Sequence, residues 1–244
     1  MSLTLKLALS PLLVAQAWRT RARLPRLPEA AGERQGIVGQ GPQLRLLVAG
    51  DSSAAGVGVD SQQQALAAPL AARLAQRCGA QVQWQLIAAS GLTTKQTHER
   101  LMANHAGFFD VAVIVTGVND VIDQVPTRRA VDTRDALVNW LRNGIGVQHV
   151  CFAPLPPVHR FPGLPQPLRW VAGADARRHN RALVSWAGTR DDASVVAIDL
   201  PLRRDVMAQD GFHPGAPVYR ACAASIADHL ASQVWPTLHQ ESTR

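Results

Sequence analysis

The sequence predicts a three-layer α/β/α sandwich around a five-stranded parallel sheet. From Leu44 onward, short runs rich in Val, Ile and Leu alternate with longer segments of helical periodicity. The runs are almost continuously apolar, as in strands that are buried on both faces of a parallel sheet. Strands that alternate with helices in this way are typical of a doubly wound α/β domain, and 244 residues suffice for one such domain.

Five apolar runs with turn residues at their ends are predicted to be the strands. They are Leu44–Ala49, Val82–Ala88, Val111–Thr116, Val147–Ala153 and Ser194–Ile198. The helices are expected between and after them, at Ser61–Cys78, Thr93–Asn104, Thr127–Asn143, Asp175–Ala187 and Pro217–Trp235. We expect the first helix to begin at Ser61, because Gln64 three residues later completes a capping-box pattern.

The stretch from Leu155 to Trp170 interrupts the alternation, because its five prolines exclude a regular helix or a central strand. It is too apolar for a featureless loop, and it follows the fourth predicted strand at the carboxyl edge, where open α/β sheets bind ligands. We expect this stretch to form a wall or lid of a substrate pocket, which His159 could line. A loop that only packs on the surface is the alternative.

Residues 1–43 are expected to form an N-terminal extension and linker, and residues 44–244 the folded domain. Leu3–Ala17 is mostly apolar, a basic segment ends near Arg26, and Leu27–Gln43 is rich in Pro, Gly and Glu. The apolar part is shorter than the ~20 residues that span a bilayer. We favour a helix, within residues 1–26, that docks on the domain or on a membrane surface. An export signal and a packed terminus remain alternatives, and a cytoplasmic or membrane-associated location is favoured over export.

The net charge of +7 does not predict a nucleic-acid partner, because residues 1–40 concentrate six basic against two acidic side chains. No nucleic-acid motif appears in the rest of the chain. Cys78, Cys151 and Cys222 are odd in number and lie in apolar stretches, which favours free, buried thiols over disulfides or a metal site.

Four short blocks supply the groups that a serine esterase needs. They are Gly50-Asp51-Ser52-Ser53, Ser90-Gly91, Gly117-Val118-Asn119-Asp120 and Asp210-Gly211-Phe212-His213. The first three follow predicted strands, so they are expected at one edge of the sheet. The blocks contain a hydroxyl nucleophile, an imidazole base with a carboxylate three positions before it, and donors for an oxyanion.

At these blocks the chain resembles the SGNH hydrolases, also called the GDSL family. The resemblance implies a flavodoxin-like α/β fold. The resemblance implies that Ser52 is the nucleophile, His213 the general base and Asp210 the residue that orients it. It further implies an oxyanion hole made by the N–H groups of Ser52 and Gly91 and the side chain of Asn119. No metal and no cofactor is implied. Residues 44–244 would then be the catalytic domain, acting on a small-molecule or lipid acyl ester.

Several assignments stay open at this point. Ser53 is a nearby alternative nucleophile, and Asp199 or Asp205 could replace Asp210. Asn119 and Asp120 could belong to a helix-capping turn, with Asp120 capping the next helix or bracing the loop. A carbohydrate O-acetylesterase, a thioesterase or a lysophospholipase could use the same groups, and a lipid-binding domain without catalysis is a further alternative.

Two other folds with a sequence signature are disfavoured. Gly56-Val57-Gly58 follows the first predicted strand, but the third glycine of a dinucleotide fingerprint would fall on Ser61. An α/β-hydrolase would place its serine in Gly-X-Ser-X-Gly, which does not occur in this sequence.

Overall fold

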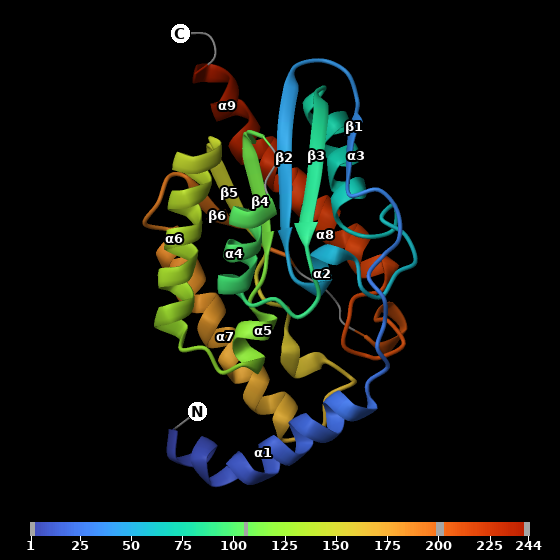
Figure 1. The fold of residues 1–244 in the computed structure, drawn as a ribbon, viewed down its shortest axis with the longest axis vertical. Helices are drawn as coiled ribbons and strands as arrows, with labels where there is room; N and C mark the ends of the chain where they lie inside the picture. The colour runs from blue at the N-terminus through green and yellow to red at the C-terminus, as the bar shows by residue number, and fades with distance from the viewer. Residues whose placement is uncertain (1–2, 105–106, 199–202, 242–244) are drawn as a thin grey trace.

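The computed structural model describes residues 3–104, 107–198 and 203–241, and these build a six-stranded sheet with helices on both faces (Figure 1). The strand order is β1-β3-β2-β4-β5-β6. The strands are β1 Gln35–Val38, β2 Gln43–Gly50, β3 Gln81–Ala88, β4 Val111–Val115, β5 His149–Phe152 and β6 Ala193–Val195. Strands β2 to β6 pair in parallel, whereas β1 pairs antiparallel with β3. The predicted five-stranded parallel sheet in an α/β sandwich is therefore confirmed, with one further strand at its edge.

The helices cover both faces of this sheet (Figure 1). They are α1 Leu3–Arg23, α2 Ser52–Ala55, α3 Ala67–Cys78, α4 Thr94–Asn104, α5 Val118–Ile122, α6 Thr127–Ile145, α7 Leu168–Ala187, α8 Ala216–His229 and α9 Trp235–Glu241. A five-residue π-helical segment, Leu230–Val234, joins α8 to α9. Helices α3 and α8 pack on one face of the sheet, and α4, α6 and α7 contribute to the core on the other.

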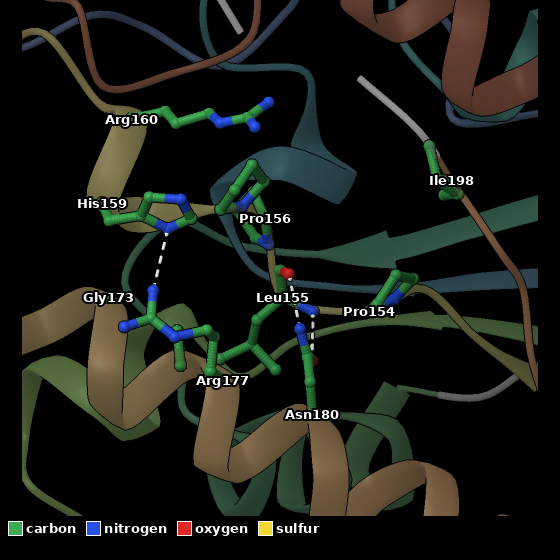
Figure 2. A pocket seen from close by; sticks show the side chains of 11 residues that line it. Pro154, Leu155, Pro156, His159, Arg160, Gly173, Arg177, Asn180 and Ile198 are labelled. Carbon is green, nitrogen blue, oxygen red and sulfur yellow. Dashed lines mark hydrogen bonds between the residues drawn. The ribbon is translucent and has the colours of Figure 1, made fainter. Parts of the chain in front are cut away.

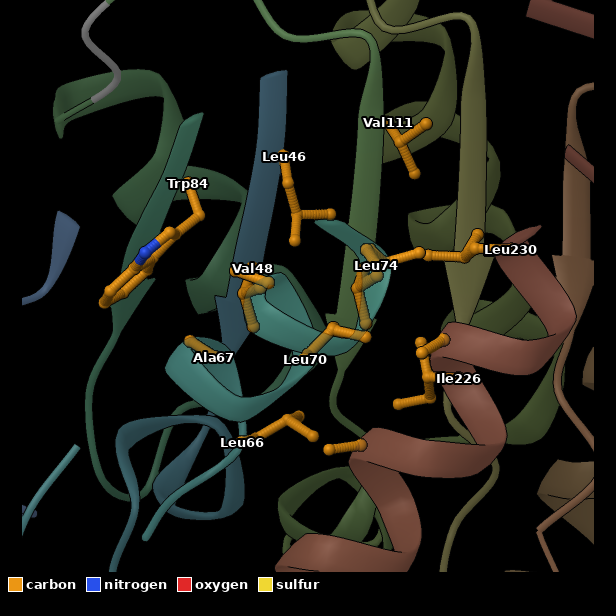
Figure 3. Close-up of a cluster of buried hydrophobic side chains, with 14 of the residues drawn as sticks. Leu46, Val48, Leu66, Ala67, Leu70, Leu74, Trp84, Val111, Ile226 and Leu230 are labelled. Atoms are coloured by element: carbon orange, nitrogen blue, oxygen red, sulfur yellow. The ribbon is translucent and has the colours of Figure 1, made fainter. Parts of the chain in front are cut away.

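Strand β2 shows why the predicted strands are almost continuously apolar. Leu46 and Val48 belong to the core under α3 and α8, together with Leu70 and Ile226 (Figure 3). The residue between them, Leu47, belongs to the core on the opposite face. Because successive side chains of a strand point to opposite faces, a strand covered on both sides is apolar at most of its positions.

The helix expected at Ser61–Cys78 begins later in the chain, so the capping-box interpretation of Ser61 is wrong. Helix α3 begins at Ala67, and the preceding turns hydrogen-bond to the N-terminal segment instead. The N–H of Gln62 donates to the carbonyl of Ala31 at 2.8 Å, and the Gln62 amide donates to the carbonyls of Ala30 and Ala55 at 3.1 Å. These hydrogen bonds satisfy backbone groups that have no partner within a helix.

The stretch expected to be a linker contains strand β1, whose residues alternate between exposed and half-buried. Its pairing with β3 runs from Gln35 opposite Gln85 to Val38 opposite Val82. A four-residue strand with one solvated face leaves little apolar pattern in the sequence. This explains why it was not among the predicted strands.

Helix α1 lies against helix α7 and the end of the proline-rich stretch. Lys6 forms an ion pair of 2.6 Å with the buried Asp175, and Leu13 is buried. The Gln16 amide donates to the Gln166 carbonyl at 2.7 Å and accepts from the N–H of Leu168 at 3.1 Å. No described helix, α1 included, combines the length and apolar character needed to cross a membrane.

The three cysteines are free thiols, but the expectation that they are buried holds for only one of them. Cys151 is buried, whereas Cys78 and Cys222 are half-buried. Burial raises the pKa of both Cys151 and Cys222 to about 12.

Candidate active site

The first block turns sharply from strand β2 into a short helix. Asp51 caps helix α2 by accepting a hydrogen bond of 2.9 Å from the N–H of Ser53, so Ser52 is the first helical residue. Gly50 is required here because a Cβ at this position would lie 2.0 Å from the Val115 carbonyl oxygen. Ser52 therefore stands at the carboxyl edge of the sheet, where open α/β folds bind ligands.

The second and third blocks follow the two strands that flank β2. Gly50 pairs in register with Ala88 of β3 and with Val115 of β4, so all three strands end at one level. The side-chain N–H of Asn119 donates to the Leu92 carbonyl at 3.0 Å and thereby links the third block to the second. The sheet thus brings these three sequence-predicted blocks to one place.

In the fourth block, one imidazole connects the acid to the serine. The Nδ1 of His213 lies 2.6 Å from Asp210 Oδ2, and its Nε2 lies 3.1 Å from Ser52 Oγ. Because Asp210 accepts the hydrogen of Nδ1, the neutral ring leaves Nε2 free to accept a proton from Ser52. The imidazole contacts Ser52 rather than the neighbouring Ser53.

Hydrogen bonds keep the carboxyl group of Asp210 ionised. Its other oxygen, Oδ1, accepts hydrogen bonds of 2.9 Å from the backbone N–H groups of Phe212 and His213. Burial alone would raise the pKa of Asp210, but the hydrogen bonds from His213 and from these N–H groups lower it below its usual value. Of the alternative acids, Asp205 is exposed and pairs with Arg203 at 2.6 Å, and Asp199 lies outside the described residues.

A second carboxyl group, that of Asp51, lies beside the serine but differs in its electrostatics. Burial raises the pKa of Asp51 to about 7, against the lowering effect of the hydrogen bond from Ser53. At neutral pH, Asp210 is therefore ionised next to His213, whereas burial favours the protonated form of Asp51.

The proline-rich stretch packs against the segment that carries His213. The N–H of Gly163 donates to the Gly211 carbonyl at 2.9 Å. The ring of Phe161 meets that of Phe212 edge-on at 5.2 Å between centroids, and Phe212 meets His213 in the same way at the same distance. The stretch therefore supports the imidazole through the ring of Phe212.

Asp120 stabilises the loop of the third block but does not cap the helix that follows it in sequence. Its carboxylate accepts hydrogen bonds from the N–H of Thr94 at 2.9 Å and from the Thr94 hydroxyl at 2.5 Å, at the start of α4. Arg134 lies 3.4 Å from the same carboxylate, and both side chains are buried. Asp120 thereby connects the block that contains Asn119 to helices α4 and α6.

Two residues that position the second block were missed by sequence reasoning. The carboxylate of Glu29 accepts hydrogen bonds from the N–H of Ser90 at 2.6 Å and from its hydroxyl at 2.8 Å. Arg34 pairs with Glu29 at 2.6 Å and donates to the carbonyl of Ala88 at 2.9 Å. Both residues lie in the stretch expected to be a linker, and an acidic and a basic residue five positions apart are too common to serve as a signal.

Comparison with known proteins identifies the chain. A family model described as GDSL-like Lipase/Acylhydrolase family matches residues 48–221. The chain belongs to this family. It is therefore a hydrolase of the GDSL or SGNH type, and the matched range contains all four blocks of the site. No curated protein matched the chain.

Solved structures of other hydrolases share the fold of this GDSL-like hydrolase. A lipolytic G-D-S-L family protein from Veillonella parvula is 15% identical, with a TM-score of 0.58, over 78% of this chain and 99% of that chain. The esterase EstA from a Pseudoalteromonas species, inhibited by monoethylphosphonate in its structure, is 17% identical, with a TM-score of 0.55, over 76% and 98%.

A carbohydrate esterase of family 2 with a carbohydrate-binding domain, from Corynascus thermopiles, is also similar to this GDSL-like hydrolase. It is 16% identical, with a TM-score of 0.59, over 86% of this chain and 69% of that chain. At such identities the likeness shows the fold. Within the described ranges of the GDSL-like hydrolase, no group of three or more His, Cys, Asp and Glu side chains could hold a metal ion.

Proposed function

We propose that the protein hydrolyses carboxylic esters through an acyl-enzyme formed on Ser52, with His213 as general base and Asp210 as the residue that orients it. The observation that carries this proposal is the continuous chain of hydrogen bonds from Asp210 Oδ2 through both nitrogens of His213 to Ser52 Oγ. A nucleophile, a base and an orienting acid in hydrogen-bond reach are what acyl transfer requires.

In the first half-reaction, Ser52 Oγ attacks the carbonyl carbon of the ester while His213 Nε2 takes the hydroxyl proton. The tetrahedral intermediate then collapses, the bond to the alcohol oxygen breaks, and His213 returns the proton to the departing alcohol. Asp210 stabilises the imidazolium that exists between these steps. The low pKa of Asp210 suits this role, because the carboxylate stays charged throughout.

In the second half-reaction, water takes the place of the alcohol. His213 Nε2 removes a proton from the water, whose oxygen attacks the acyl carbon, and the bond to Ser52 Oγ breaks. The proton returns to Ser52, and the carboxylic acid leaves. No redox partner or additional reactant enters this cycle.

For the negative oxygen of the intermediate, we propose three donors: the N–H groups of Ser52 and Gly91 and the side-chain amide of Asn119. Ser52 opens helix α2, so its N–H is not used by the helix. Gly91 is exposed and has a φ of +83°, with open space where a side chain would stand. One N–H of the Asn119 amide bonds to Leu92, which orients the amide and leaves its second N–H for the substrate.

Labelling with an activated phosphonate ester tests the proposed nucleophile directly. We expect a single phosphonyl group on Ser52, because only a serine that His213 deprotonates reacts readily with such reagents. Peptide mass spectrometry locates the modification. Labelling of Ser53 or Ser90, or equal labelling after heat denaturation, would contradict the proposal.

Asn119→Ala should lower kcat by roughly 10²–10³-fold with a smaller change in KM, because the amide acts mainly on the transition state. Steady-state kinetics with a short-chain nitrophenyl ester measures both constants. Asn139→Ala, on the exposed face of α6, is a matched control and should leave both unchanged. An unchanged kcat in Asn119→Ala would return this residue to a capping role.

Carboxylic esters are the proposed substrates, and several subclasses of ester are compatible with the proposed site. The structural neighbours described above include a lipolytic protein, an esterase and a carbohydrate esterase. We keep the carboxylesterase assignment, with O-acetylesterase, thioesterase and lysophospholipase activities as alternatives. Relative kcat/KM values for nitrophenyl esters of increasing chain length, an acetylated sugar, an acyl thioester and a lysophospholipid distinguish these subclasses.

Helix α1 supports the proposal that residues 1–26 associate with a membrane surface. Leu7, Val14 and Trp18 lie on one helical face and are 62–72% exposed, whereas Leu13 lies buried on the side that contacts the domain. Basic side chains follow this apolar face along the chain: Arg19, Arg21, Arg23 and Arg26. An apolar face bordered by arginines suits the surface of an anionic bilayer.

Replacing Leu7, Val14 and Trp18 together by Ser should weaken binding to vesicles containing phosphatidylglycerol by about tenfold or more, because three apolar side chains no longer enter the bilayer. Vesicle sedimentation measures the bound fraction. Val184→Ser, which changes an exposed apolar residue of α7, is the control and should bind like the original chain. Equal binding by the triple variant would contradict this role for α1.

A further inference from the structure

A pocket of about 320 Å³ lies between the proline-rich stretch and helix α7 (Figure 2). Pro154, Leu155 and Pro156 form an apolar part of its wall. Asn180 of α7 holds this wall in place, because its side chain accepts from the N–H and donates to the carbonyl of Leu155, both at 2.8 Å. The pocket is therefore built on a fixed backbone.

The remaining polar groups of the pocket are basic. Figure 2 shows His159 between Arg160 and Arg177, and Arg177 Nη1 lies 3.2 Å from His159 Nδ1. Because arginine can only donate, Nδ1 of the neutral imidazole accepts this hydrogen bond and Nε2 carries the hydrogen. Among the described residues that line the pocket, none carries a carboxylate.

The charges of the two arginines affect the histidine that lies between them. Burial lowers the pKa of His159, and the charges of Arg177 and Arg160 lower it further. Both guanidinium groups are on exposed residues and thus accessible to a ligand. The planar guanidinium fork matches the paired oxygens of carboxylates and phosphates.

Two chains of contacts link the pocket to the segments that carry the proposed catalytic groups. Leu155 lines the pocket and also packs against Gly117, where an added Cβ would lie 2.8 Å from Leu155 Cδ1. Gly117 opens the block that contains Asn119. On the other side, Phe161 follows Arg160 and reaches His213 through the ring of Phe212.

The geometry points to a second binding site: Arg160, Arg177 and His159 bind a carboxylate or phosphate group, and this group is carried by the ester substrate. The apolar wall would accommodate the chain that joins this group to the ester. The assignment of the group to the substrate rests on the proposed hydrolase function. The presence of an anion site in this pocket does not depend on that function.

The kinetic test compares two nitrophenyl esters of equal chain length, a half-ester of a dicarboxylic acid and a neutral monocarboxylic ester. We expect the acidic ester to have a kcat/KM about tenfold or more above that of the neutral ester, since charge-assisted hydrogen bonds to arginine are strong. Arg177→Gln and Arg160→Gln should each reduce this ratio by several fold. Arg181→Gln, one turn further along α7 and outside the pocket, should leave the ratio unchanged.

A binding test uses inorganic phosphate without any ester. Phosphate should raise the thermal unfolding midpoint of the original chain and of Arg181→Gln more than that of Arg177→Gln. Phosphate binding that depends on Arg177, without a preference for the acidic ester, would show that the site takes a free anion and would overturn its role in substrate recognition. The absence of both effects would overturn the site itself. If no ester is hydrolysed, the proposed function fails, and the phosphate titration still reports on the pocket.

Discussion

Ser52→Ala is expected to reduce kcat/KM for a short-chain nitrophenyl ester by about 10³-fold or more. The change removes the atom that we propose forms the acyl-enzyme, while the backbone N–H of residue 52 and the other groups of the proposed oxyanion hole remain. Ser52 is half-buried at the start of a four-residue helix, so loss of its hydroxyl leaves no cavity in the core. The variant should therefore keep the thermal unfolding midpoint of the original chain within a few degrees.

Ser53→Ala is the matched control for this experiment. Its hydroxyl is one position further along the same turn, and its backbone N–H still donates to Asp51. We expect kcat/KM of this variant within about threefold of the original value. Substantial turnover by Ser52→Ala, or a comparable loss in Ser53→Ala, would refute Ser52 as the nucleophile.

Asp210→Asn should lower kcat by about 10²–10⁴-fold without unfolding the protein. The asparagine oxygen can still accept from the N–H groups of Phe212 and His213 in place of Asp210 Oδ1. Its amide group, however, would replace Oδ2 opposite His213 Nδ1 and donate to that nitrogen. The neutral ring must then carry its hydrogen on Nε2, where it can no longer take the proton of Ser52.

The tautomer can be read independently of activity, because the nitrogen chemical shifts of His213 differ between the two neutral forms. In the original chain the hydrogen should be on Nδ1, and in Asp210→Asn on Nε2. Asp205→Asn changes an exposed aspartate of the same region and serves as the control. An unchanged kcat in Asp210→Asn together with a loss in Asp205→Asn would reassign the acid.

The fold was accessible from the sequence because the central strands are mostly apolar and alternate with helical segments. The runs at Leu44–Ala49 and Val111–Thr116 differ from strands β2 and β4 by at most one residue at each end. The site was accessible for a related reason, since three of its four blocks follow the ends of central strands and the chemistry needs particular residue types in all four. The distance between Ser52 and His213 is consistent with this interpretation.

The parts that the sequence did not reveal depend on contacts between distant segments. The turns after Ser61 follow a capping pattern, yet hydrogen bonds between Gln62 and the N-terminal segment determine their conformation. The support that Glu29 gives to Ser90 joins positions 61 residues apart. Such contacts have no periodicity, so local patterns cannot indicate them.

The hydrogen bond between His213 and Ser52 joins residues 161 positions apart, which has a consequence for folding. Ser52 follows the second strand of the chain, and His213 immediately precedes helix α8, whose Ile226 packs in the same core as Leu70 of α3. Closing so long a loop is entropically expensive, and the cost is recovered only when α8 docks on the rest of the domain. A chain that has formed every strand but has not yet docked α8 therefore has the proposed nucleophile without its proposed base. We expect recovery of turnover during refolding to mark the docking of α8 and not the formation of the sheet.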